Sequence, residues 1–246
     1  IKDWMRQEAN RNGLKPEKIF LVSAAKKKNL DELMAFLAKK GEKKDIYFVG
    51  TTNVGKSTLI NAIINMNSDL KDVITTSKFP GTTLDEIKIP LSNGHCLIDT
   101  PGILNANQLA SHLSGKELEV VEPKKPLKPA TYQLLPGQTI FLAGLGRFDY
   151  VDGPSAGFTI YVARDLYVHR TKTENADAFY EKHKDDLLLP PSKEDNLGPL
   201  KGQTFSPKEK SDILFGGVGF ITTPANVVVK AYTPEGIGLG IRRALI

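Results

Sequence analysis

Residues 46–64 read IYFVGTTNVGKSTLINAII. The apolar run 46–49 is typical of a short buried strand, and the apolar positions from Ser57 to Ile64 recur at helical spacing. Between them, Gly50 to Ser57 matches the pattern G-x-x-x-x-G-K-[ST] at every fixed position. This strand–loop–helix context predicts a P-loop, whose backbone wraps around phosphate oxygens. A glycine turn with a chance lysine is the alternative, and the flanking elements disfavour it.

The residue types in this loop suit phosphate chemistry. Its glycines let the backbone approach phosphate oxygens closely, and the helix N-terminus presents unpaired N–H groups to the anion. We expect Lys56 to reach the β and γ phosphates and the Ser57 hydroxyl to bind Mg²⁺. The predicted nucleotide-binding residues of this loop are Thr52, Asn53, Val54, Gly55, Lys56, Ser57 and Thr58.

Composition excludes several classes of protein. The chain has 246 residues, of which 40% are hydrophobic and 25% charged, as in globular proteins. Its single cysteine, Cys96, excludes a disulfide framework and a cysteine-based zinc site within these residues. We expect a reducing, cytoplasmic location, and no stretch suggests a signal peptide or a membrane partner. The chain begins at Ile1 inside an expected helix, so we expect it to be a fragment.

The net charge of +5 and the pI near 9.1 fit an anionic partner such as RNA, or equally a basic, solvated surface.

The first part of the chain alternates between predicted strands and helices. Helices are expected at 1–12 and 31–40, besides the one after the P-loop, and 19–22 reads as a parallel strand. Residues 84–91 and 95–98 flank Asn93-Gly94, which is a strong hairpin signal. The predicted fold class is α/β: a parallel sheet with helices on both faces.

The second part is expected to be rich in β-strands. Short apolar runs at 139–143, 158–163, 166–169 and 227–231 are separated by Gly, Pro and Asp. A helix is expected within 174–189 and a long loop over 190–211. The predicted organisation is a GTPase-like domain over 1–115, a proline- and lysine-rich linker over 116–130, and a β-rich domain over 131–246.

Two segments after the P-loop carry further nucleotide chemistry. Asp99-Thr100-Pro101-Gly102 follows a predicted strand, where an aspartate can bind Mg²⁺ and the Gly102 N–H can sense a γ-phosphate. In the segment 79–85, Thr83 can place its hydroxyl on Mg²⁺ when the γ-phosphate is present. The alternative for this segment is a simple Pro-Gly turn. The predicted catalytic residues are Lys56, Thr83 and Gly102, and the predicted Mg²⁺ ligands are Ser57, Thr83 and Asp99.

A third candidate segment precedes the P-loop. Ser23-Ala24-Ala25 is a small-residue loop whose backbone N–H groups could meet a purine edge. The alternative is a strand-to-helix turn capped by Asn29 or Asp31.

These motifs together resemble those of the Era-like GTPases. Gly50–Ser57 is similar to their G1 motif, Pro80-Gly81-Thr82-Thr83 to G2, Asp99–Gly102 to G3, and Ser23–Ala25 to G5. In ordinary GTPases G5 comes last, whereas here it precedes G1. The chain therefore resembles a circularly permuted GTPase, and the guanine-reading N-K-x-D motif (G4) is expected before Ile1.

Longer stretches resemble the YqeH-type permuted GTPases, which are related to nitric oxide-associated protein 1. They include VITTSKFPGTTLDEIKIPL at 73–91 and YQLLPGQTIFLAGLGRFDYV at 132–151. The resemblance implies GTP and GDP as ligands with Mg²⁺, and a role in small ribosomal subunit assembly through rRNA or a ribosomal protein. It also implies a K⁺ ion held by Asn53. The N-terminal zinc finger of that family is absent here.

Two further expectations follow. Ile103 occupies the position where many GTPases carry a water-orienting glutamine, so intrinsic turnover should be slow. The β domain of the family resembles an RNA-binding attenuation protein fold. The candidate RNA contacts here are Arg147, Arg164, His169, Arg170, Lys172, Arg242 and Arg243, with Phe148, Tyr150 and Tyr161 as stacking residues. The rival reading is an RNA-binding scaffold whose nucleotide site is structural or degenerate.

Overall fold

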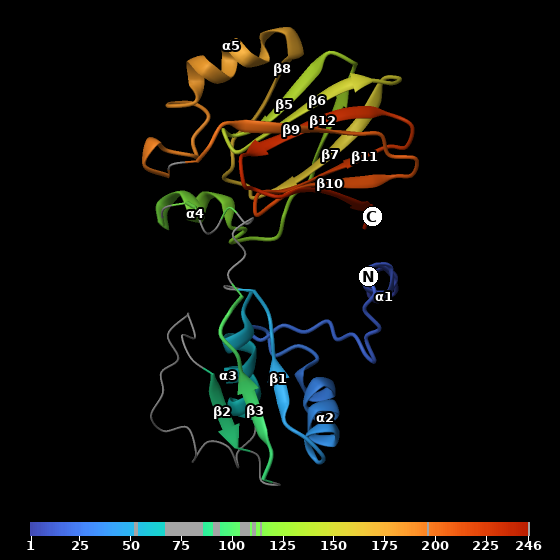
Figure 1. Cartoon of the computed structure of the whole chain (residues 1–246), viewed down its shortest axis with the longest axis vertical. Helices are drawn as coiled ribbons and strands as arrows, with labels where there is room; N and C mark the ends of the chain where they lie inside the picture. Colours follow the sequence, from blue (N-terminus) through green and yellow to red (C-terminus); the bar gives the residue numbers. More distant parts are fainter. Residues whose placement is uncertain are drawn as a thin grey trace. The chain divides into compact units, whose positions relative to one another are not determined.

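The computed structural model describes residues 1–51, 54–66, 86–90, 94–103, 109, 112, 113, 115–195 and 197–245 (Figure 1). The chain divides into two compact units, residues 1–105 (unit 1) and 106–246 (unit 2). Each unit is described by itself.

Unit 1 contains a three-stranded sheet and three helices. Its elements are α1 (Lys2–Arg11), α2 (Leu30–Gly41), β1 (Ile46–Phe48), α3 (Lys56–Met66), β2 (Ile87–Pro90) and β3 (Cys96–Asp99). The strand order is β1-β3-β2, with β1 parallel and β2 antiparallel to β3. The predicted P-loop strand and helix are confirmed, as is the hairpin. The described sheet is mixed rather than wholly parallel, because β2 and β3 form that hairpin.

The core of unit 1 joins the sheet to two helices. Ile60, Ile63 and Ile64 of α3 are buried together with Leu33 of α2 and with Leu97 of β3. Their i, i+3 and i+4 spacing places the α3 side chains on one helical face, as the sequence predicted. This packing fixes the start of α3 against the sheet.

The prediction of a strand at 19–22 is wrong. Phe20 and Val22 do pack against the unit 1 core, but the structure gives them no strand. The chain turns back at once, since Ser23 and Lys28 exchange two backbone hydrogen bonds of 3.1 and 3.0 Å. The Asn29 side-chain amide donates to the Leu21 carbonyl at 2.7 Å. These local bonds supply backbone partners that a ladder would otherwise provide.

Unit 2 is a β-sandwich, which confirms the expected β-rich domain. Its elements are α4 (Gly115–Val121), β4 (Ala130–Leu134), β5 (Gln138–Leu142), β6 (Gly146–Asp152), β7 (Ala156–Val162), β8 (Val168–Lys172), α5 (Thr173–His183), the 3₁₀ turn η3 (Lys193–Asp195), β9 (Leu200–Phe205), β10 (Ser211–Phe215), β11 (Gly219–Thr223), β12 (Val228–Pro234) and β13 (Leu239–Arg243). Two antiparallel sheets have the orders β13-β10-β11-β7-β4 (sheet D) and β8-β5-β6-β12-β9 (sheet E).

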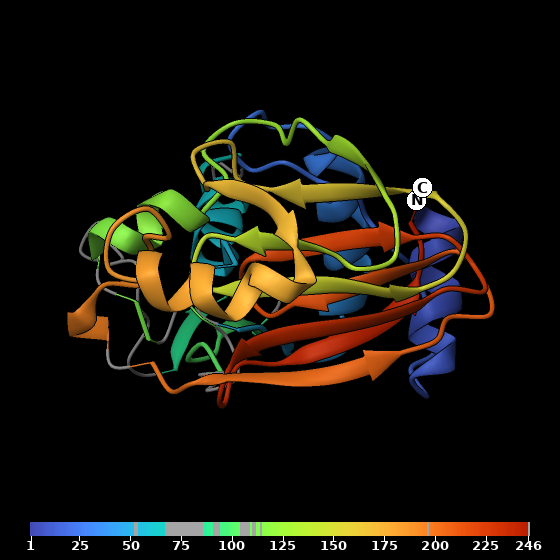
Figure 2. The same ribbon diagram turned by 90° about the horizontal axis from the view of Figure 1, so that it is seen from above.

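Alternating side chains from both sheets fill the space between them. Phe148 and Tyr150 of β6 meet Phe158 of β7, with ring centroids 5.3 and 4.8 Å apart. The predicted helix in 174–189 is α5, which lies on the outer face of sheet E (Figure 2). There Phe179 and Tyr180 pack on Phe141. Sheet E is thus buried on both faces beneath α5.

The structure corrects two boundaries in this part of the chain. The division between units falls at 105/106, and the predicted linker 116–130 contains α4, whose Val121 side chain is 2% exposed in the unit 2 core. The predicted loop 190–211 contains β9, the outermost strand of sheet E. Four of the six β9 residues are exposed, so the strand lacks the apolar alternation that a half-buried strand shows.

We predict that Phe158→Ala destabilises unit 2 by about 3–5 kcal/mol, because the fully buried ring would leave a cavity between the sheets. Hydrogen exchange of peptides from β6 and β7, measured by mass spectrometry, would report this loss locally. Leu135→Ala is the matched control, since Leu135 is 56% exposed. Its effect should stay within about 0.5 kcal/mol. Equal protection in both variants would contradict the assigned core.

Candidate functional site

The P-loop and the D-x-x-G segment meet at one edge of the unit 1 sheet. β1 and β3 run parallel, and Phe48 pairs with Asp99 in their register. The carboxyl ends of parallel strands lie at the same edge, where ligands bind in open α/β sheets. The loop after β1 leads to the start of α3 at Lys56, and Asp99 is the last residue of β3. The fold thus gathers motifs that lie more than forty residues apart in sequence, as the 44 positions between Lys56 and Thr100 show.

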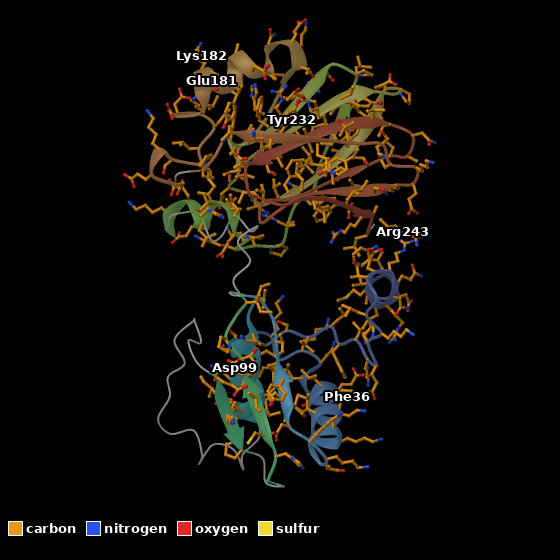
Figure 3. The ribbon with its side chains drawn as sticks, viewed as in Figure 1. Phe36, Asp99, Glu181, Lys182, Tyr232 and Arg243 are labelled. Atoms are coloured by element: carbon orange, nitrogen blue, oxygen red, sulfur yellow. The ribbon has the colours of Figure 1, made fainter. Side chains whose placement is uncertain are left out.

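Asp99 is the centre of this site (Figure 3). Its side chain is 1% exposed, and its Oδ2 accepts a hydrogen bond of 2.8 Å from the Ser57 hydroxyl. The Lys56 ammonium lies 3.3 Å from Asp99 Oδ1 and also donates to the Thr100 carbonyl. A buried carboxylate needs such partners, because an isolated charge in the interior is very costly. One carboxylate therefore positions both of the residues predicted to bind phosphate and Mg²⁺.

The D-x-x-G segment is tied to the P-loop through its backbone. Thr100 donates from its amide and its hydroxyl to the Phe48 carbonyl, at 3.3 and 2.8 Å. Three residues later the Ile103 amide donates to the Gly50 carbonyl at 2.9 Å. Gly102, the predicted γ-phosphate sensor, is thus held between two attachments to the phosphate-binding loop. The Ile103 side chain is 56% exposed.

Glycine is required at one position of the P-loop. Gly55 has φ +85°, a left-handed conformation that other residues rarely adopt. Its carbonyl accepts the hydrogen bond from Leu59 N at 2.9 Å, within the first turn of α3. Val54 and Thr58, beside it, are exposed. The geometry agrees with a loop that bends sharply into a helix N-terminus.

The Ser23–Ala25 segment forms a tight turn before α2. Lys26 N donates to the Ser23 hydroxyl at 3.3 Å, and Asn29 adopts φ 56° immediately before the helix. Asn29 makes no side-chain capping bond to α2, so the capping alternative for Asn29 is not seen. Contact of Ser23, Ala24 or Ala25 with a base stays a prediction.

Three of the predicted site residues lie outside the described part of the chain. They are Thr52, Asn53 and Thr83. Their roles in binding nucleotide, K⁺ and Mg²⁺ therefore stay predictions.

The structure overturns three of the candidate RNA contacts in unit 2. Phe148 and Tyr150 are 0% exposed and belong to the core between the sheets, so neither ring can stack on a base. Arg147 is 8% exposed and binds the Asp149 carboxylate in a bidentate pair, at 2.8 and 2.9 Å. Its remaining nitrogen donates to Asp177 of α5. The guanidinium is buried because α5 covers the outer face on which it lies.

The Arg147 guanidinium nonetheless keeps its charge. Burial acts to lower its pKa, but the hydrogen bonds from Asp149 and Asp177 outweigh burial, and the pKa is raised. Breaking either bond would leave a buried charge with fewer partners. Arg147 is therefore a structural residue that attaches α5 to sheet E.

Four further candidates also have partners within unit 2. Arg164 donates to the Pro126 carbonyl, Arg170 to the Gln133 carbonyl, and Lys172 pairs with Glu174. The His169 ring stacks on Phe179 at 4.1 Å, and burial, together with nearby His183, lowers its pKa. Tyr161, Arg242 and Arg243 remain, and they lie on sheet D.

The sequence pattern did not single out Phe220, which stacks on Tyr161 with ring centroids 4.5 Å apart. Phe220 and Ile221 are adjacent and both apolar, so the pattern could not tell which of them faces the core. The partnership of Arg147 with Asp177 is also absent from any local pattern, since 30 positions separate the two.

Comparisons with known proteins divide the chain in a similar way. Residues 45–128 match the family described as 50S ribosome-binding GTPase, and residues 155–245 match the family described as YqeH-like, C-terminal. None of the helices in the described ranges has the length and apolar character of a membrane span.

Three relatives bear on the chain. It is 49% identical over 247 residues to the uncharacterized protein YqeH of Bacillus subtilis, covering 99% of this chain and 68% of that protein. It is 26% identical to human nitric oxide-associated protein 1, over 92% of this chain and 50% of that protein. A shorter match, 41% identical over 76 residues, is to small ribosomal subunit biogenesis GTPase RsgA 2 of Lactiplantibacillus plantarum, over 30% of this chain and 21% of that protein.

The near full-length identity to the Bacillus protein, the two family matches and the P-loop geometry agree with one another. The chain carries a P-loop GTPase domain followed by a β-rich domain, and it belongs to the YqeH-like family of GTPases.

Proposed function

We propose that this chain is the switch portion of a protein that hydrolyses GTP to GDP and phosphate during small ribosomal subunit assembly. The observation that carries the proposal is the shared attachment of Lys56 and Ser57 to the buried carboxylate of Asp99. It brings a phosphate-binding cation, a Mg²⁺-binding hydroxyl and a carboxylate together at one sheet edge. The RsgA relative, named for small ribosomal subunit biogenesis, supports the biological setting.

The donor set fits Mg²⁺. Ser57 and Asp99 supply a hydroxyl and a carboxylate oxygen 2.8 Å apart, and hard oxygen donors of this kind are what Mg²⁺ prefers. Thr83 would add a third oxygen from the segment 79–85. When bound, Mg²⁺ would neutralise charge on the β and γ phosphates. The residues present therefore suit the ion that the GTPase class employs.

Phosphate binding would require Lys56 to exchange partners. Its ammonium now contacts Asp99 and the Thr100 carbonyl, and a β- or γ-phosphate would compete for the same cation. Because Thr100 bonds to Phe48 and Ile103 bonds to Gly50, a shift at Lys56 acts directly on the D-x-x-G segment. We propose that residues 75–85 and 99–105 form the switch, and that unit 2 couples it to rRNA or a ribosomal protein.

The order of motifs favours a circularly permuted domain, because the Ser23–Ala25 segment precedes the P-loop. β1 is the outermost strand of the described sheet, and its neighbourhood exposes 58% of Tyr47 and 66% of Val49. Apolar side chains of this size at a sheet edge are usually covered by further elements of the same domain. We propose that the guanine-reading N-K-x-D segment comes before Ser23 in the chain order of the whole protein.

Turnover should be slow without an activator. Ile103 follows Gly102, and its exposed aliphatic side chain cannot hydrogen-bond an attacking water. We propose that Asn53 holds a K⁺ ion near the β–γ bridge, which would supply positive charge where negative charge develops.

We predict that Lys56→Ala in the full-length protein lowers Mg²⁺-dependent GTP hydrolysis by about 100-fold or more, the scale for loss of one group that stabilises developing charge. Phosphate release measured at saturating GTP would show the loss. Lys88→Ala is the matched control, because Lys88 is an exposed lysine on β2 of the same unit. Equal rates for the two variants would refute the site. Absence of hydrolysis in the unaltered protein would favour the rival, an RNA-binding scaffold with a structural nucleotide site.

We also predict that replacing Na⁺ by K⁺ at constant ionic strength accelerates hydrolysis by about tenfold or more, if K⁺ supplies transition-state charge. Asn53→Ala should remove the difference between the two salts while leaving GTP binding measurable. A wild-type rate that is identical in both salts would eliminate the K⁺ site.

A further inference from the structure

The outer face of sheet D carries a continuous polar row across all five strands. The antiparallel registers align Thr131 with Thr159, Thr159 with Thr222, Thr222 with Asp212, and Asp212 with Arg242. The neighbouring residues Phe158, Ile160, Ile213 and Ile221 are buried in the core between the sheets. Because successive side chains in a strand alternate in direction, the Thr131-to-Arg242 row lies on the opposite, outward face.

An aromatic row lies beside the polar row on the same outward face. Tyr161 aligns with Phe220, Phe220 with Leu214, and Leu214 with Gly240, each two residues from its counterpart in the first row. The Tyr161 and Phe220 rings are nearly parallel, 11° between planes with centroids 4.5 Å apart, and both side chains are partly exposed. The Arg242 guanidinium lies over Phe220, 5.0 Å from its ring centre. We call these two rows the Tyr161 face.

The charge of the Tyr161 face favours an anion. Its one carboxylate, Asp212, is 0% exposed and accepts hydrogen bonds from Thr222 at 2.6 Å, Arg242 at 3.1 Å and the Leu245 amide at 3.3 Å. The negative charge is thereby compensated beneath the surface. At its edge, Arg243 of β13 is 45% exposed, and its ion pair with Glu209, at 3.9 Å, is of the weak surface kind (Figure 3).

The described helices of unit 2 are engaged elsewhere. α5 packs on Phe141 of sheet E, and α4 places Val121 in the core between the sheets (Figures 1 and 2). The outer face of an antiparallel sheet usually carries polar residues, whereas here stacked rings stand among threonines and an arginine. Aromatic rings next to cationic side chains and hydroxyls suit a ligand with flat, stackable groups on an anionic backbone.

We propose that the Tyr161 face binds single-stranded RNA, with a base extending the Tyr161–Phe220 stack and a phosphate held at Arg243. Single strands are specified because bases in a duplex are already stacked on one another and cannot reach a flat sheet. This inference rests on the proposed function only in naming the ribosomal partner as RNA; the GTPase chemistry is independent of it.

The test uses the full-length protein and a fluorescently labelled, mixed-sequence RNA of about 12 nucleotides, within the usual range of single-strand sites. Fluorescence anisotropy would measure affinity for this strand and for its duplex. Tyr161→Ala should weaken single-strand binding about 5- to 150-fold, and Tyr161→Phe, which keeps the ring, should bind like the wild type. Arg243→Ala should lower the dependence of log affinity on log salt concentration by about one phosphate contact.

The matched control is Tyr167→Ala, a tyrosine 37% exposed that stacks on His169 beside sheet E. It should bind RNA normally. Equal weakening by Tyr161→Ala and Tyr167→Ala, or none by either, would overturn the proposal, as would tighter binding of the duplex. Binding of a ribosomal subunit that is lost in Tyr161→Ala without any RNA affinity would assign the face to a protein instead. GTP hydrolysis should be unchanged in Tyr161→Ala, and its absence from the wild type would count against the proposed function alone.

Discussion

The buried carboxylate of Asp99 is the constraint on which unit 1 depends. Placed at the end of β3 with 1% exposure, it must be compensated, and the compensation comes from Lys56 and Ser57 at the start of α3. That requirement joins the P-loop to the D-x-x-G segment without any ligand. It also means that a phosphate entering the site must displace interactions that already exist. A switch of this kind responds to nucleotide because the same cation has two alternative anionic partners.

Unit 2 shows how a covering helix decides what a sheet can do. The two sheets contribute alternating side chains to one core, but their outer faces differ. On sheet E, α5 covers Phe141 and Arg147 and converts polar and aromatic side chains into structural ones. On sheet D, the Tyr161–Phe220 stack and Arg243 stay partly exposed. Residues of the same chemical type thus have opposite fates, according to whether a helix packs on their face.

Local motifs were predictable to the extent that their information lies in neighbouring residues. The P-loop strand and helix, the Asn93-Gly94 hairpin and helix α5 all follow from periodicity and turn chemistry. The segment 19–22 was mistaken for a strand because an apolar run describes burial, which Phe20 and Val22 have, but not ladder pairing, which they lack. β9 was mistaken for a loop for the converse reason: as an exposed edge strand it pairs with β12 without burying an alternating face.

The sequence by itself determined that a phosphate-binding loop stands between a strand and a helix, because glycine conformations and a lysine at fixed spacing are properties of adjacent residues. It also determined the β-rich character of the second half. Only the tertiary structure decided that Asp99 holds both Lys56 and Ser57, that Phe148 and Tyr150 belong to the core, and that Tyr161 and Phe220 share an outward face. These facts depend on strand register and helix packing, which bring together residues dozens of positions apart, and no local pattern contains that information.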